Sequence, residues 1–163
     1  MSLFLKNTLA CLVFFVLLST NVQACDMNPE TVVNQLMADY SARSAARVLS
    51  HYHEKAEFYD GAFDSTYSGI ESIEKDVIAV FLSIIPDLTW KKAEGTKTSV
   101  IDASVFIEWE LSGSPSKELQ AVPENLQGPF KIRGFSVFVI DQSSCKIKSQ
   151  RDFYNAPAFF NYL

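Results

Sequence analysis

Residues 146–163 close the chain and read KIKSQRDFYNAPAFFNYL. The pattern from Lys146 to Tyr154 predicts a β-strand with two faces: Lys148, Gln150, Asp152 and Tyr154 on one, and Ile147, Ser149, Arg151 and Phe153 on the other. Strands are depleted in Asp. Asp152 therefore lies either on a solvated face or in a cavity that requires a carboxylate. After this strand, Pro157 predicts a short terminal helix.

The same period-two pattern extends upstream as far as Leu88. It predicts antiparallel strands over the following ranges: 88–97, 99–112, 130–141 and 146–154. Residues 113–128 contain prolines and glycines and predict a long loop, and residues 142–144 predict a hairpin turn. An earlier strand is expected over 55–60, followed by a loop over 61–69.

Helical spacing dominates the first half of the chain. Asn28-Pro29-Glu30 is typical of a helix start, with apolar residues following at helical spacing: Val33, Leu36, Met37 and Tyr40. A second helix over 42–52 would bury one face: Ala45, Val48, Leu49 and Tyr52. A long helix is expected over 70–85, where Pro86 ends it.

Early helices followed by a run of strands predict an α+β fold. We expect a curved antiparallel sheet with helices packed on one face, forming a conical pocket. The length of 163 residues suffices for one domain with a real core. The formal net charge of −5, without a Lys/Arg cluster, argues against a nucleic-acid-binding surface.

Residues 1–24 have the pattern of a signal peptide. Lys6 supplies the positive start, residues 8–18 form an apolar run too short to span a bilayer comfortably, and Val22-Gln23-Ala24 fits the cleavage rule. We expect an exported chain, periplasmic or secreted, with a single domain over 25–163. An anchoring helix is the less favoured alternative.

Cys25 directly follows the predicted cleavage site. Val22 to Cys25 also resembles a bacterial lipobox, which would attach a lipid to Cys25, but Gln23 fits that pattern poorly, so ordinary cleavage is preferred. Cys11 leaves with the signal peptide. Cys25 and Cys145 then form an even pair, which in an oxidising compartment predicts a disulfide that a lipidated Cys25 could not form.

Five stretches in order resemble one known family. They are Gly69-Ile70-Glu71-Ser72-Ile73, the helix end from Phe81 to Leu88, Trp109-Glu110-Leu111-Ser112-Gly113, the strand from Lys131 to Phe138, and Arg151-Asp152-Phe153-Tyr154-Asn155. Together they resemble the SnoaL-like polyketide cyclases within the nuclear transport factor 2-like superfamily. The resemblance covers nearly all of the chain after residue 24 and implies the conical fold.

The resemblance leaves function open, because the superfamily includes cyclases, epoxide hydrolases, isomerases, dehydratases and non-catalytic binding domains. In its cyclase and limonene epoxide hydrolase branches, an Asp of the last strand performs acid/base chemistry, and Asp152 resembles that residue. The hydrolase branch also needs an Arg-x-Asp pair, where this chain has Trp109 and Leu111. Its Tyr-x-Asn pair is replaced by Phe58 and Asp60. Hydrolase chemistry is therefore not expected.

Each carboxylate has two interpretations. Asp152 in an apolar cone would have a raised pKa and transfer protons near neutral pH, or it would be structural and pair with Arg43, Arg133, Arg151 or a lysine. Asp60 would be a second carboxylate of the pocket, or a turn residue before a glycine. For Asp60 the turn interpretation is preferred.

Other candidate side chains have structural alternatives. Tyr59 and Tyr154 could donate to a ligand oxygen or pack as aromatic residues at the core edge, and Trp109 is expected in the core. His51 and His53 resemble metal ligands in spacing, but a third ligand is missing from the pattern, so neither a metal nor a cofactor is expected.

Two functions fit these patterns. The first is an acid/base enzyme, cyclase-like or isomerase-like, in which Asp152 carries the proton and Phe58, Asp60, Trp109, Leu111 and Tyr154 contact a small, largely apolar molecule. The second is a non-catalytic ligand-binding or protein-pairing module with a structural Asp152. An inward Asp152 without a cationic partner favours the enzyme. A homodimer is left open, and membrane contact is expected only if Cys25 is lipidated.

Overall fold

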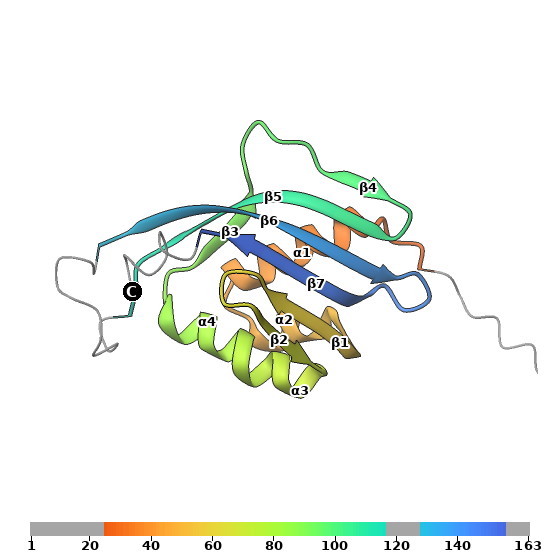
Figure 1. Ribbon diagram of the computed structural model, residues 1–163, viewed down its shortest axis with the longest axis horizontal. Helices are drawn as coiled ribbons and strands as arrows, with labels where there is room; N and C mark the ends of the chain where they lie inside the picture. The colour runs from red at the N-terminus through yellow and green to blue at the C-terminus, as the bar shows by residue number, and fades with distance from the viewer. Residues whose placement is uncertain (1–24, 117–127, 156–163) are drawn as a thin grey trace, which may run out of the picture.

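The computed structural model describes residues 25–116 and 128–155 (Figure 1). The predicted signal peptide, most of the predicted loop over 113–128 and the predicted terminal helix after Pro157 lie outside the described residues. Within the described part of the chain, no helix is long and apolar enough to cross a membrane.

A curved sheet of seven strands forms the frame of the molecule. The strands are β1 (Tyr52–Asp60), β2 (Ser65–Ser68), β3 (Thr89–Lys92), β4 (Ser99–Ile101), β5 (Ser104–Gly113), β6 (Phe130–Asp141) and β7 (Lys146–Tyr154). Their order is β2-β1-β7-β6-β5-β3, and β4 pairs with β5. All pairs are antiparallel except β1 with β7, which is parallel. The last described strand therefore lies in the middle of the sheet.

The helices lie on one side of the arch that β5, β6 and β7 form (Figure 1). They are α1 (Pro29–Ser41), α2 (Ala45–Ser50) and a long segment made of α3 (Ile70–Ser72), a π-helical turn η1 (Ile73–Ile78) and α4 (Ala79–Ile84). The Asn28 side chain accepts a hydrogen bond from the Glu30 backbone N–H and so caps α1. The fold class and the helix end before Pro86 are confirmed.

The strand predicted over 99–112 is wrong, because it is two strands. Asp102 adopts a left-handed backbone conformation, with φ of 53°, and β4 turns back onto β5 at this point. Asp tolerates this conformation without glycine. The alternation of apolar side chains continues on both sides of the turn, so the pattern alone does not reveal it.

Other boundaries also differ from the prediction. The second helix is shorter than predicted, and Tyr52 begins β1 instead of ending that helix. Ala45 is exposed rather than buried. The predicted loop over 61–69 contains β2, and the strand predicted over 88–97 is reduced to β3.

A β-bulge corrects the predicted faces of β7. Ile140 pairs with Ile147, whereas Val139 pairs with Ser149, so Lys148 is an extra residue in the strand. Ile147 is buried before the bulge, and Gln150 and Asp152 are buried after it. Lys148 is exposed, and its Nζ lies 3.5 Å from Asp141 Oδ2. The prediction is right for Gln150 and Asp152 but wrong for Lys148 and Ile147.

Cys25 and Cys145, the pair that the sequence analysis connects, are joined by a disulfide in the structure. Their Cα atoms lie 5.1 Å apart, within the usual range for a disulfide. The Cys25 N–H also donates to the Gln142 carbonyl, 2.5 Å away. The bond therefore attaches the chain just before α1 to the turn between β6 and β7.

Candidate active site

Asp152 is buried near the centre of the sheet, with only 8% of the residue exposed. Its carboxylate accepts three hydrogen bonds from neighbouring side chains. The Ser136 hydroxyl donates to Oδ1 at 2.5 Å, and Gln150 Nε2 lies 3.1 Å from Oδ1 and 2.9 Å from Oδ2. Ser136 is directly opposite Asp152 on β6. The sheet register thus brings Ser136 to Asp152, and Gln150 lies two residues earlier on the same face of β7.

A second layer of hydrogen bonds orients these donors. Trp109 Nε1–H donates to the Ser136 hydroxyl oxygen at 2.6 Å, so the Ser136 proton is directed to Asp152. The Tyr52 hydroxyl donates to Gln150 Oε1 at 2.5 Å, which leaves the amide nitrogen facing the carboxylate. Both donors are buried. The protein therefore holds Asp152 in one defined hydrogen-bonding arrangement.

Gly134 makes room for the Trp109 indole. The two residues are opposite each other on β6 and β5, and a Cβ atom on Gly134 would lie 2.2 Å from the indole ring. No side chain larger than hydrogen fits that position without moving the ring. The Gly134 of the stretch that resembles the family therefore supports the hydrogen bond from Trp109 to Ser136.

Each arginine considered as a partner of Asp152 is engaged elsewhere. Arg133 Nε lies 3.9 Å from Glu110 Oε2 on the outer side of the sheet. Arg151 lies over the Tyr59 ring, 5.4 Å from its centroid. Arg43 donates to the carbonyls of Leu82 and Ile85 at the end of α4. Among the described residues, Asp152 forms no ion pair.

This environment shifts the acidity of Asp152. Burial raises the pKa of Asp152 from 3.8 to about 7, and the nearby Asp60 carboxylate acts in the same direction. The hydrogen bonds from Ser136 and Gln150 oppose this rise, since they favour the ionised form. A carboxyl with a pKa near neutrality can both accept and return a proton at physiological pH.

Asp60 combines features of both interpretations. It ends β1, is paired with Asp152 in the parallel register and has only 5% of the residue exposed. Its Oδ1 accepts from the Ala62 N–H, as in an Asx turn, and its Oδ2 accepts from the Tyr154 hydroxyl, each at 2.9 Å. Burial raises the pKa of Asp60, and the Tyr154 hydrogen bond opposes that rise.

Two adjoining cavities border these carboxylates. The smaller, about 30 Å³, is lined by Tyr40, Phe81, Leu88, Trp90, Trp109, Leu111, Ile132, Gln150, Asp152 and Tyr154. The larger, about 250 Å³, is lined by Phe58, Asp60, Phe63, Ser65, Tyr67, Asp76, Val77, Val80, Phe81, Ile84 and Tyr154. Phe81 and Tyr154 line both. All six side chains predicted to form the site border at least one of the two cavities.

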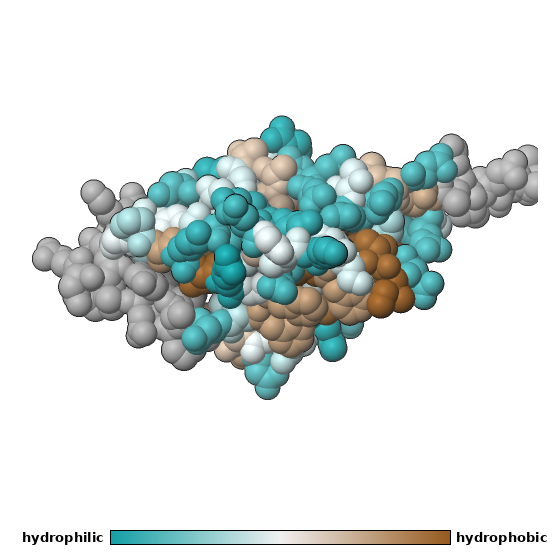
Figure 2. All heavy atoms as spheres, turned by 90° about the horizontal axis from the view of Figure 1, so that it is seen from above, coloured by the Kyte–Doolittle hydropathy of each residue, from teal (hydrophilic) through white to brown (hydrophobic). Residues whose placement is uncertain are grey.

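Tyr59, another predicted candidate, lies away from these cavities. Tyr59 packs against Phe153 on the outer side of the sheet, with ring centroids 5.9 Å apart, and donates to Asp64. It cannot serve a ligand in the cavities. The outer side, seen from above, carries mostly hydrophilic side chains with hydrophobic ones between them (Figure 2).

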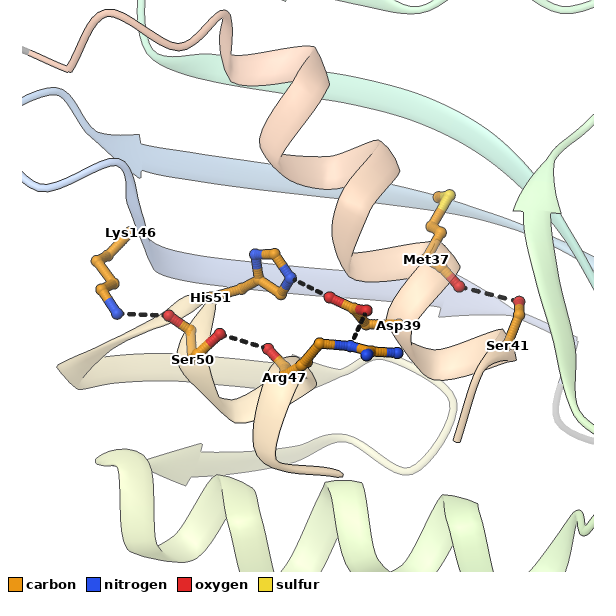
Figure 3. Close-up of polar contacts among 7 residues, drawn as sticks. All are labelled: Met37, Asp39, Ser41, Arg47, Ser50, His51 and Lys146. Carbon is orange, nitrogen blue, oxygen red and sulfur yellow. Dashed lines mark hydrogen bonds and ion pairs between the residues drawn. The ribbon is translucent and has the colours of Figure 1, made fainter. Parts of the chain in front are cut away.

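His51 belongs to an ion-pair cluster that connects α1 and α2 (Figure 3). Its Nε2 lies 2.8 Å from Asp39 Oδ2, and Arg47 Nε lies 2.7 Å from Asp39 Oδ1. These contacts lower the pKa of the Asp39 carboxyl, although its partial burial acts the other way. Over residues 25–116 and 128–155, no group of three His, Cys, Asp or Glu residues could hold a metal ion.

Sequence reasoning missed four side chains around Asp152: Tyr52, Trp90, Ser136 and Gln150. Gln150 was placed on the correct face but without a role. Ser136 stands between apolar residues in a strand buried on that side, and such an isolated polar residue is a usable signal, because buried polar groups need partners. The hydrogen bond of the Tyr52 hydroxyl to Gln150 could not be predicted, since Tyr52 was expected at the end of a helix and not in a strand.

No family model matches the chain, and no curated protein matches its sequence. Among solved structures, the chain is similar to a protein assigned as a SnoaL-like polyketide cyclase from Shewanella denitrificans, with 13% identity and a TM-score of 0.69 over 82% of this chain and 95% of that one. It is similar to an NTF2-like protein from Burkholderia thailandensis, with 16% identity and a TM-score of 0.65 over 83% and 97%. The chain has the nuclear transport factor 2-like fold.

A third similar structure is a protein with a ketosteroid isomerase-like fold from Catenulispora acidiphila, in complex with trimethylamine. Its identity is 20% and its TM-score 0.62, over 78% of this chain and 87% of that one. At these identities the nuclear transport factor 2-like fold is what the chain and these proteins share. The chemistry has to be argued from this chain's own side chains.

Proposed function

We propose that this protein is an acid/base enzyme that acts on a small, largely apolar molecule in a cyclase-like or isomerase-like reaction, with Asp152 as the proton carrier. The observation that carries the proposal is the state of Asp152: it is buried in the wall of an apolar cavity, accepts three hydrogen bonds and has no cationic partner among the described residues. Several similar structures are assigned as SnoaL-like polyketide cyclases, which supports the proposal of a cyclase-like enzyme.

In the proposed reaction, ionised Asp152 takes a proton from a carbon of the bound molecule. The C–H electron pair moves into the substrate, and the neutral acid then returns the proton to another atom. Atoms and electrons balance within the substrate and Asp152. Ser136 and Gln150 hold the carboxylate in place during both transfers, and the pKa of about 7 makes both protonation states of Asp152 accessible near neutral pH.

The cavities limit how a ligand would enter. The space beside Asp152 holds about two water molecules, whereas the adjoining space beside Asp60 is several times larger. Tyr154 and Phe81 line both, and in the proposed function one of these side chains turns so that the two spaces join. A ring-sized substrate would occupy the combined space and reach Asp152 past Tyr154.

A thermal-shift screen of residues 25–163 against lipophilic lactones, steroids and polyketide-like acids tests the proposal, since a ligand stabilises the native state by mass action. Compounds that bind are then tested for turnover. Asp152→Asn should still bind them and lose about a hundredfold or more in turnover. Asp102→Asn, at an exposed turn, is the matched control. Equal turnover in the two variants would contradict the role of Asp152.

A non-catalytic binding module is the second candidate. Two observations favour it: the hydrogen bonds of Asp152 are complete without a ligand, and the space beside it is small. In that case, compounds bind in the larger cavity without conversion, and Asp152→Asn changes neither affinity nor product. Product analysis after prolonged incubation separates the two candidates.

Export belongs to the proposal as well. The predicted signal peptide lies outside the described residues, but the Cys25–Cys145 bond supports an oxidising compartment such as the periplasm or the extracellular space. It also argues against a lipid on Cys25, because that sulfur is already bonded. Intact mass with and without reductant, after alkylation, tests both points: two free thiols or a lipid adduct would refute them.

A further inference from the structure

Trp90 is held rigidly in the wall of the smaller cavity. It lies in β3 opposite Leu111, and its backbone N–H donates to Ser41 Oγ at 2.9 Å, while that hydroxyl lies 3.1 Å from the Trp90 carbonyl oxygen. Its ring packs edge-on against Tyr40 and Trp109, with centroid distances of 5.3 and 6.0 Å. Only 6% of the residue is exposed. The indole therefore has little freedom to turn towards another partner.

The Trp90 indole N–H is a buried donor without an acceptor. Among the described residues, Trp90 Nε1 and Thr98 Oγ1 are the two buried side-chain atoms that form no hydrogen bond, and only Trp90 lines one of the two cavities. By contrast, the other indole near the cavity, that of Trp109, donates to Ser136. Native proteins rarely leave such a donor unpaired, because its lost hydration is then uncompensated.

We propose that the Trp90 indole N–H donates a hydrogen bond to a neutral oxygen atom of the ligand. This inference rests on the proposed function, since it uses the cavity that contains Asp152. A carbonyl or ether oxygen suits the site, because the donor is uncharged and the lining, apart from Asp152, Gln150 and the two tyrosine hydroxyls, is apolar. A carboxylate or phosphate does not, since it would lie in the same small cavity as the Asp152 carboxylate and face no cation there. The ligand is thus an apolar molecule with a neutral oxygen, positioned between Trp90 and Asp152.

A matched pair of probes can test this contact without any known reaction. Acetophenone and α-methylstyrene have nearly the same shape and differ in a C=O in place of a C=CH₂ group. The chain contains two tryptophans, so the ¹⁵N-labelled protein gives two indole N–H signals, which Trp90→Phe assigns. Trp109, already hydrogen-bonded to Ser136, is the internal control.

We expect both probes to perturb cavity signals and only acetophenone to move the Trp90 indole proton downfield, with the Trp109 indole proton little changed. Titrations should show about tenfold tighter binding of acetophenone than of α-methylstyrene, and this preference should disappear in Trp90→Phe. If Trp90→Phe does not fold, sequential assignment of the parent protein still identifies the Trp90 indole signal. The chemical-shift change of that signal with acetophenone then tests the hydrogen bond by itself.

The outcomes separate the inference from the function on which it rests. If both probes bind but move the Trp90 signal alike, the donor role of Trp90 is wrong and the small-molecule function stands. The donor role of Trp90 is also wrong if acetophenone binds without moving the Trp90 indole signal. That result is expected when a retained water molecule accepts the hydrogen bond. If neither probe perturbs the cavity signals up to its solubility limit, binding of small apolar molecules fails and the Trp90 contact fails with it.

Discussion

At the scale of single residues, the site depends on two opposing effects on the pKa of Asp152. Burial favours the neutral acid, whereas the donors Ser136 and Gln150 favour the carboxylate. The result is a group with a pKa of about 7 rather than 3.8. Because folding itself raises this pKa, Asp152 couples the protonation state of the site to the stability of the protein.

The pH dependence of stability should show this coupling. A raised pKa in the folded state means that the folded protein binds the proton more tightly than the unfolded chain. The free energy of unfolding should therefore fall as the pH rises from about 4 to about 7, by up to about 4 kcal/mol. Denaturant titrations of the parent protein between pH 4.5 and 8 measure this fall.

Asp152→Asn should remove most of that decline and leave the smaller contribution of Asp60, whose pKa is also raised. Asp102→Asn should keep the full decline, since Asp102 is exposed. Working above pH 4.5 avoids Asp141, whose pKa is lowered to about 2 and whose contribution is lost only in more acidic solution. A decline of equal size in both variants would refute the assignment to Asp152.

Gly134→Ala tests the room required by the Trp109 indole. Its Cβ would overlap the indole ring, and overpacking of this kind costs about 1–3 kcal/mol. We expect a melting temperature lower by several degrees and a shifted Trp109 indole signal, because the hydrogen bond to Ser136 is displaced. Gly128→Ala is the matched control, since nothing lies within 4 Å of its added Cβ. Equal melting of the two variants would contradict this explanation.

At the scale of helices and strands, the sequence was informative where side-chain periodicity is unbroken. The long helix before Pro86 follows its apolar pattern, and the bounds of the strand containing Asp152 were also predicted. The turn at Asp102 and the bulge at Lys148 were not, because each depends on backbone conformation or pairing register, which side-chain polarity does not encode. The same limit explains why Ser136 was not assigned to Asp152, since the pairing of β6 with β7 brings it there, whereas Gln150 shares a strand face with Asp152 and was missed only in its role.

The disulfide is the main covalent constraint on these elements. It joins residues 120 positions apart and holds the start of α1 against the β6–β7 turn. Chain-entropy arguments give about 4–5 kcal/mol as the upper contribution of such a long loop. We expect Cys25→Ser with Cys145→Ser to lower the denaturation midpoint markedly, and dithiothreitol to lower that of the parent protein to the same value. A midpoint unchanged by reductant would show that the bond does not stabilise the fold.

At the scale of the whole molecule, the sheet depends on its last described strand. β7 lies between β1 and β6, so it alone connects the β1–β2 hairpin to the β6-β5-β3 part of the sheet. A chain that ends at Asp141 should therefore lack a cooperative melting transition, although it retains every helix of the described residues. The full chain with Cys25→Ser and Cys145→Ser is the control, because it has also lost the disulfide but keeps β7. A cooperative transition in the shortened chain would contradict the central role of β7.

The central place of β7 also has a consequence for biosynthesis. A ribosome releases the chain from its N-terminus, so β1 and β2 emerge roughly ninety residues before the strand that joins them to β6. Contacts between such distant segments form late and slowly. The sheet can close only after β7 has left the ribosome, and until then the β1–β2 hairpin lacks the strand that joins it to β6. For the export proposed above, this delay would keep the sheet open while the chain crosses the membrane.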